Sequence, residues 1–207
     1  MELARKMILS AKENGADLVK FQLYDAEDDK GKPHYEWVKK AELTFEQAKM
    51  LFDYGAEVGI EVFFSVFGIK YVKWCEKIGV KRYKIASTFS GRYDTWFAVK
   101  QTTKPIISSF ADLPLDWEES GTVLYCPQGY PQENPQLCDL QFPFVGFSDH
   151  TIGLNAAKVA LASGVQIIEK HFILDRNSQS PEREWSMTPN ELRELKRWEA
   201  ICQKVEG

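Results

Sequence analysis

The sequence predicts an α/β protein with the fold of a TIM-type (β/α)₈ barrel of parallel strands from which the first strand is missing. Short apolar segments alternate with helical segments at a spacing of roughly 20–30 residues, the pattern of a parallel sheet with helical crossovers. Seven strands are expected and a helix precedes the first of them, so an eighth strand would have to lie ahead of Met1. A doubly wound open sheet is the alternative, but no GxGxxG turn supports it.

The expected helices are recognised by apolar residues at helical spacing and by capping residues at their ends. Thr44, followed three residues later by Gln47, resembles a capping box. Thr188 and Pro189 suit the cap and the first position of the final helix, and Gly79 suits a helix end. The helices, a weaker one near 134–140 included, are expected at 1–14, 44–59, 69–78, 92–101, 134–140, 154–163 and from Thr188 onward.

Each expected strand is a short, mainly apolar run bounded by turn residues. The polar segment 23–42, which holds Gly31 and Pro33, is expected to be a long loop, and 110–120 is expected to be irregular. The strands are expected at 18–22, 61–65, 82–86, 104–108, 122–126, 144–148 and 166–170.

Composition indicates one ordinary globular domain over 1–207. The chain has 207 residues, a formal net charge of −4 and 44% hydrophobic residues, which excludes a disordered chain. The pI of about 5.5 and the lack of a basic stripe argue against a nucleic-acid partner. No apolar stretch reaches the ~18–20 residues of a membrane helix, and no signal-peptide core follows the charged start. The four cysteines form no CxxC pair, so reduced thiols and a cytoplasmic location are expected.

Two lysines lie inside otherwise apolar strands. Lys20 and Lys84 come near the carboxyl ends of their strands, the end at which a barrel carries its site. A lysine in a strand often occupies an edge or solvent position. If both point inward, however, they need anionic partners, because an unpaired buried ammonium group is unfavourable. A phosphate or carboxylate ligand would meet that need.

Two of the three histidines end consecutive strands. His150 and His171 are one strand–helix unit apart, so both imidazoles could reach one divalent transition metal ion at the barrel mouth. Two hydrogen-bonded structural histidines are the alternative. His34 lies in the polar loop and is expected to be solvated.

Several collinear motifs resemble those of the N-acetylneuraminate (sialic acid) synthase family, which includes legionaminic and pseudaminic acid synthases and spore-coat polysaccharide relatives. The resemblance covers about 1–205, and together the motifs are highly specific. They are GFSDHTIG at 146–153, IEKHF at 168–172, LDR at 174–176, VKFQ at 19–22, YKIAS at 83–87, KPII at 104–107 and Tyr130-Pro131.

The resemblance implies condensation of phosphoenolpyruvate with an N-acylated amino sugar such as N-acetylmannosamine. The products would be a nine-carbon 2-keto acid and phosphate, made for a surface polysaccharide. The implied cofactor is Mn²⁺ or Mg²⁺ bound by His150 and His171. The residues implied in catalysis are Lys20, Lys84, Asp149 and Glu182, and those implied in substrate binding are Gln22, Ser87, Ser109, Tyr130 and Ser148.

Two of the carboxylates near the motif histidines have further expected roles. Asp149 would orient His150 or hold neighbouring backbone. Glu169 is expected chiefly to pair with a lysine inside the barrel. Glu182 stands where the family has an aspartate, so its side chain is one methylene longer.

The chain departs from the family pattern on the substrate side. Phe89 replaces a carboxylate, Gly129 an asparagine, Tyr125 a histidine and Val66 a phosphate-contacting threonine. Neither the family's first strand nor its C-terminal antifreeze-like domain is expected within residues 1–207. The chain is therefore interpreted as a divergent synthase, as part of a longer or split protein, or as a relative that binds phosphoenolpyruvate or metal without synthesis. A phosphosugar 2-keto acid synthase is a further alternative, against which the SDHT and EKHF motifs argue.

The missing strand has a consequence for association. Segments 18–22 and 166–170 would each leave an unpaired sheet edge, which is a template for pairing. A homo-oligomer, a partner that supplies the strand, or a rearranged terminus is expected to cover the gap.

Overall fold

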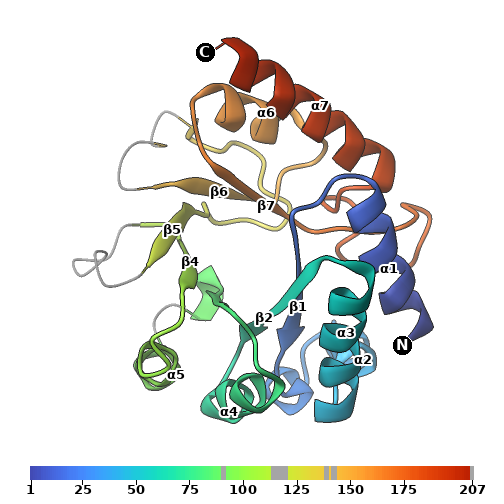
Figure 1. Cartoon of the computed structure of the whole chain (residues 1–207), viewed down its shortest axis with the longest axis vertical. Helices are drawn as coiled ribbons and strands as arrows, with labels where there is room; N and C mark the ends of the chain where they lie inside the picture. The colour runs from blue at the N-terminus through green and yellow to red at the C-terminus, as the bar shows by residue number, and fades with distance from the viewer. Residues whose placement is uncertain (90–91, 113–120, 138–139, 141–143, 206–207) are drawn as a thin grey trace.

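In the described part of the chain, seven parallel strands form one curled sheet, and helices cover its outer face (Figure 1). The computed structural model describes residues 1–89, 92–112, 121–137, 140 and 144–205. The strands pair in chain order, each with the next. They are β1 (Leu18–Leu23), β2 (Glu61–Val66), β3 (Tyr83–Ile85), β4 (Ile106–Phe110), β5 (Thr122–Tyr125), β6 (Gly146–Asp149) and β7 (Ile167–Lys170). The prediction of seven parallel strands in a barrel that lacks one strand is confirmed.

Most of the expected helices are present, with capping as the sequence indicates. Thr44 and Gln47 form a complete capping box, and Thr188 exchanges hydrogen bonds with Glu191 in the same way. Gly79 ends its helix in the left-handed conformation. The α-helices are α1 (Glu2–Glu13), α2 (Tyr35–Ala41), α3 (Phe45–Val58), α4 (Ile69–Ile78), α5 (Tyr93–Lys100), α6 (Asn155–Ala162) and α7 (Pro189–Val205). Within the described residues, none is long and apolar enough to cross a membrane.

The prediction that 23–42 is a long loop is wrong. The segment contains a 3₁₀ helix, η1 (Ala26–Asp29), and α2. The Tyr24 hydroxyl donates to the carbonyl of Val38 at 3.0 Å, and the Tyr35 hydroxyl donates to the Glu27 carboxylate at 2.6 Å. These polar contacts order the segment. Because the residues of the segment are mainly polar, its sequence shows no hydrophobic periodicity from which a helix could have been predicted.

Smaller differences concern boundaries. The strand expected from 104 begins at Ile106, because Pro105 has no amide hydrogen to donate to the sheet. The strand expected from 144 begins at Gly146. Of the weak helix expected at 134–140, residues 134–136 are not helical and 138–139 lie outside the described residues, as does 113–120 of the irregular segment.

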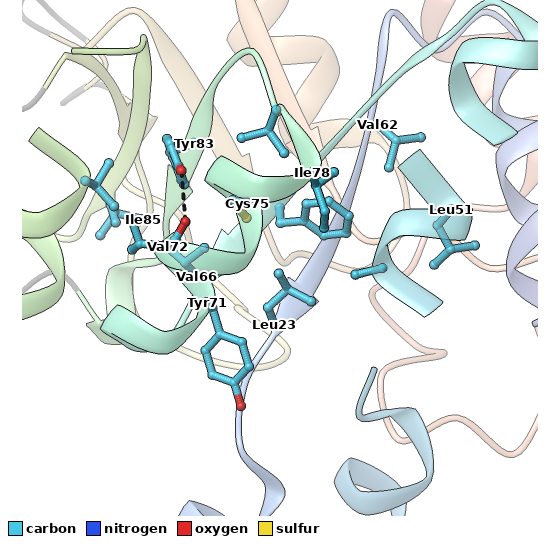
Figure 2. Close-up of a cluster of buried hydrophobic side chains, with 14 of the residues drawn as sticks. Leu23, Leu51, Val62, Val66, Tyr71, Val72, Cys75, Ile78, Tyr83 and Ile85 are labelled. Carbon is cyan, nitrogen blue, oxygen red and sulfur yellow. Dashed lines mark hydrogen bonds between the residues drawn. The ribbon is translucent and has the colours of Figure 1, made fainter. Parts of the chain in front are cut away.

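The main hydrophobic core lies between the sheet and the helices α3 and α4. Figure 2 shows Leu23, Val62 and Val66 from the strands meeting Leu51 and Cys75 from these helices. The opposite face of the sheet carries a smaller cluster of buried side chains, made of Phe63, Ile107 and Leu124. Alternation along β2 therefore sends Val62, Phe64 and Val66 outward and Phe63 inward, which leaves the inward positions nearer the carboxyl end for polar residues.

Gly146, the first residue of the 146–153 motif, lies too close to the neighbouring strands to carry a side chain. A Cβ added there would lie 2.4 Å from the carbonyl oxygen of Ile167 and 2.7 Å from Cδ2 of Leu124. We expect Gly146→Ala to reduce the free energy of unfolding by about 1–3 kcal/mol, because β6 and β7 must separate to admit the methyl group. Urea denaturation measures this loss. An unchanged midpoint would contradict the close approach.

Both edges of the sheet are open within the described part of the chain. β1 pairs with β2 and β7 pairs with β6, and no strand lies between β1 and β7. All four residues of β7 are partly exposed, whereas β4 is buried throughout. On the outer side of the gap between β1 and β7, the last helix contacts the end of the first. Arg193 of α7 donates to Asn14, which follows α1, at 2.5 Å, and Lys196 pairs with Asp17 at 3.1 Å.

We expect these edges to cause association, since unpaired strands are templates for pairing. Size-exclusion chromatography with light scattering should give species larger than the 23.8 kDa monomer at micromolar concentration. A single monomeric species at every concentration would contradict this expectation.

Candidate functional site

Two lysines and one carboxylate from three different strands meet inside the sheet. Lys84, 2% exposed, donates to the backbone carbonyl of Ile85 at 2.9 Å and to the Ser109 hydroxyl at 2.6 Å. Its ammonium nitrogen lies 3.5 Å from Oε2 of Glu169, and that of Lys20 lies 3.5 Å from Oε1. The three residues Lys20, Lys84 and Glu169 are called the charged trio below. The structure thus places both lysines inward, and the expectation that Glu169 pairs with a lysine is confirmed.

The carboxylate of the trio is strongly held. Ser148 donates to Glu169 at 2.7 Å and Ser109 at 3.5 Å. Burial alone would raise the pKa of Glu169, but Lys84, Lys20 and the Ser148 hydrogen bond outweigh it and lower this pKa to about 2. Burial lowers the pKa of Lys84, and Glu169 opposes that shift. Glu169 is therefore ionised at neutral pH.

The charge balance of the trio favours an anionic ligand. Two ammonium groups share one carboxylate, so one positive charge is left without a counter-charge within the trio. A buried excess charge is unfavourable unless a partner neutralises it. The hydroxyls of Ser109 and Ser148 border the same space. The trio can therefore hold a phosphate or carboxylate group.

The two motif histidines lie side by side above this trio. Their ring centroids are 5.2 Å apart. Nδ1 of His171 is 3.0 Å from the Glu182 carboxylate, and Nδ1 of His150 is 3.8 Å from Sγ of Cys126. Burial, aided by the neighbouring His171, lowers the pKa of His150 to about 3, so the His150 ring is neutral at neutral pH. For Glu182, burial is outweighed by the hydrogen bond with His171, which lowers the carboxyl pKa.

The histidine pair fits part of a metal site. A neutral imidazole is the form that binds a divalent metal, and the Glu182 contact fixes the ring of His171 in the manner of a metal-binding histidine. Among the described residues, no group of three or more His, Cys, Asp or Glu side chains is placed to enclose a metal ion. The ring nitrogens of His150 and His171 are the side-chain atoms of this pair that could hold a metal ion.

An aromatic wall stands next to the histidines. The ring of Tyr130 lies 4.5 Å from that of His150 and 6.4 Å from that of Trp185, and its hydroxyl is 3.4 Å from Oγ of Ser87. Ser87 also accepts a hydrogen bond from Cys126 at 3.3 Å. The structure thus places Ser87 and Tyr130 beside the histidine pair, together with Cys126, which no sequence motif marks.

Asp149 is separate from the charged trio. Its carboxylate accepts hydrogen bonds from the backbone amide and hydroxyl of Thr151 at 2.8 and 2.7 Å, and it pairs with Lys170 at 2.8 Å. The Asp149 and Lys170 side chains are buried, at 0% and 1% exposure. The structure therefore gives Asp149 the expected contact with backbone beside His150, and gives no contact between its carboxylate and Lys20, Lys84 or Glu182.

Gln22 and Ser65 lie on the same inner face of the sheet as the lysines of the charged trio. Gln22 is two residues after Lys20 on the same face of β1 and stands in register with Ser65 of β2. Ser65 is fully buried, and its hydroxyl has no hydrogen-bond partner among the residues that the structure describes. No motif in the sequence marks Ser65, but alternation from the inward Phe63 predicts that it faces the interior.

The departures from the family pattern have separate structural settings. Val66 packs into the outer core, and the ring of Tyr125 stacks on that of Phe147. Gly129 has a φ of +119°, a conformation that side chains other than glycine rarely adopt. The side chain of Phe89 lies outside what the structure describes.

Comparisons with known proteins agree with the geometry. The chain is 32% identical over 230 residues to an uncharacterised protein of Methanocaldococcus jannaschii, with 100% of this chain and 68% of that protein covered. It is 28% identical to the N,N'-diacetyllegionaminic acid synthase of Legionella pneumophila, with 94% and 66% covered. The chain therefore spans about two thirds of the length of these curated relatives.

A solved structure gives the same result. The N-acetylneuraminic acid synthetase of Leptospira borgpetersenii superposes with a TM-score of 0.91 at 27% identity, covering 100% of this chain and 80% of that one. The model of the NeuB family matches residues 7–112 and 118–207. With its charged trio and histidine pair at the carboxyl ends of parallel strands, this chain belongs to the NeuB family.

Proposed function

We propose that this chain condenses phosphoenolpyruvate with an N-acylated amino sugar such as N-acetylmannosamine, giving a nine-carbon 2-keto acid and inorganic phosphate. The observation that carries the proposal is the charged trio, in which Lys20 and Lys84 share the single carboxylate of Glu169. Membership of a family whose relatives are named as legionaminic and sialic acid synthases supports this reaction class. The proposal keeps the expected cytoplasmic location and role in surface polysaccharide synthesis.

The reaction balances with one molecule of water. C3 of phosphoenolpyruvate forms a bond to the aldehyde carbon of the sugar, and the aldehyde oxygen becomes a hydroxyl group. Water supplies the oxygen retained at C2 when phosphate departs, which leaves the 2-keto acid. Lys20 and Lys84 would bind the phosphate or carboxylate of phosphoenolpyruvate, and Ser87, Ser109 and Ser148 would add hydroxyl contacts. Gln22 and Tyr130 would line the same pocket.

The histidine pair gives the acceptor end of the site its role. His150 and His171 would hold Mn²⁺ or Mg²⁺, which when bound polarises the aldehyde oxygen. Glu182 would hold His171 through the 3.0 Å contact at Nδ1. Asp149 would act indirectly, by holding the backbone amide of Thr151 next to His150.

A phosphate-release assay tests the proposal. Phosphoenolpyruvate and Mn²⁺ are mixed with the protein and with each of a panel of N-acylated amino sugars. We expect phosphate release that requires a sugar, stops on chelation of the metal, and falls at least 100-fold in His171→Ala. Ser163→Ala, which alters a hydroxyl on the exposed end of α6, is the matched control. Equal release by His171→Ala would contradict the assignment.

A second function is favoured by the setting of Val66. Valine has no hydroxyl to offer to a phosphate group, and this side chain is buried in the outer core. The chain would then bind phosphoenolpyruvate or metal without completing the condensation, or complete it with a partner that supplies the missing strand. Saturable phosphoenolpyruvate binding without phosphate release from any sugar would select this alternative.

A further inference from the structure

Ser65 occupies an inward position of β2 at the centre of the lysine-bearing strands. It stands in register with Gln22 of β1 on one side and with Lys84 of β3 on the other. Residues paired in this way point to the same face of a sheet, and the Lys84 contacts with Ser109 and Glu169 place that face in the interior. The hydroxyl of Ser65 therefore faces the space that the charged trio borders.

The Ser65 hydroxyl differs from its neighbours in having no partner. Ser109 accepts from Lys84 and Ser148 donates to Glu169, so both take part in the network of the trio. Ser65 is 0% exposed, and its Oγ atom makes no hydrogen bond within the described part of the chain. A buried hydroxyl without a partner destabilises a folded protein. It is retained at little penalty where a ligand supplies the missing acceptor.

We propose that Ser65 is a substrate-binding residue whose hydroxyl donates a hydrogen bond to an anionic oxygen of phosphoenolpyruvate. The inference rests on the proposed function and extends it to a residue outside the set that the resemblance assigned. It also bears on Val66, which stands where the family has a phosphate-contacting threonine. Val66 points into the outer core, so Ser65 is the residue of this pair that can offer a hydroxyl to the interior.

Ser65→Ala tests the inference through two measurements on the full chain. Isothermal titration of phosphoenolpyruvate should show affinity lowered about 10- to 100-fold, the effect of losing a hydrogen bond to a charged group. The thermal midpoint of the ligand-free variant should equal or exceed that of wild type, because the substitution removes an unpartnered buried hydroxyl. If the hydroxyl had only a structural role, the variant would keep wild-type affinity for phosphoenolpyruvate and its thermal midpoint would be lower.

The outcomes separate failure of the inference from failure of the proposed function. Wild-type affinity for phosphoenolpyruvate in Ser65→Ala, with or without a lower thermal midpoint, overturns the inference and leaves the function standing. Absence of binding by the wild-type chain overturns both. Ser163→Ala should match wild type in both measurements, because its hydroxyl donates to the carbonyl of Val159 on the exposed side of α6.

Discussion

Lys84→Met should abolish tight binding of phosphoenolpyruvate, with affinity lowered at least about 100-fold. Methionine retains much of the length and volume of the side chain but removes the ammonium group that lies between Ser109 and Glu169. The remaining charges, Lys20 and Glu169, then balance each other, so an incoming anion finds no uncompensated positive charge in the trio. A hydrogen bond to a charged group contributes about 1.5–3 kcal/mol, and the bound anion would lose both this contact with the amine and the attraction of the uncompensated charge.

Lys104→Met provides the matched control for this result. Lys104 also pairs with one glutamate, Glu76 at 2.6 Å, but it precedes β4 at the opposite end of the strand from Ser109. The control should keep wild-type affinity for phosphoenolpyruvate. Equal affinities for the Lys84→Met and wild-type chains would show that the trio does not hold the ligand.

Glu169→Gln should destabilise the fold at neutral pH and should lose its effect in acid. The pKa of Glu169 is lowered from 4.5 to about 2, so its ionisation stabilises the native state above the unfolded pKa, and this stabilisation is lost as pH falls toward 2. The shift corresponds to about 3 kcal/mol. The difference in unfolding free energy between wild type and variant should therefore be constant above about pH 6 and shrink between about pH 5 and pH 2.

Urea denaturation across this pH range measures the difference. Glu2→Gln is the control, because Glu2 pairs with Lys6 on the exposed face of α1 and should change the unfolding free energy by less than about 0.5 kcal/mol. A pH-independent difference between wild type and Glu169→Gln would contradict an ionised, lysine-paired carboxylate.

The sequence is most informative where one local rule decides the structure. Thr44 and Thr188 mark helix starts because each side chain bonds within its own first turn. The alternation of β2 fixes which residues face the helices, and the strand count predicts the open barrel. Such signals are readable because they involve neighbours in the chain.

Features that depend on contacts between distant segments could not be derived in the same way. Asp149 pairs with Lys170 because β6 and β7 place them in register, and a motif alone does not distinguish that pairing from a contact with substrate. Helix α2 is held by the hydroxyl of Tyr24, which polar composition concealed. The free hydroxyl of Ser65 becomes evident only when the partners of Ser109 and Ser148 are known.

Titration of phosphoenolpyruvate into the wild-type chain in the presence of Mn²⁺ tests the central claim most directly, because that claim is that the charged trio is an anion site. We predict saturable binding with one site per chain, abolished by Lys84→Met and kept by Lys104→Met. A folded wild-type chain that takes up no phosphoenolpyruvate at millimolar concentration would contradict it, and would leave Lys20, Lys84 and Glu169 with a structural role alone.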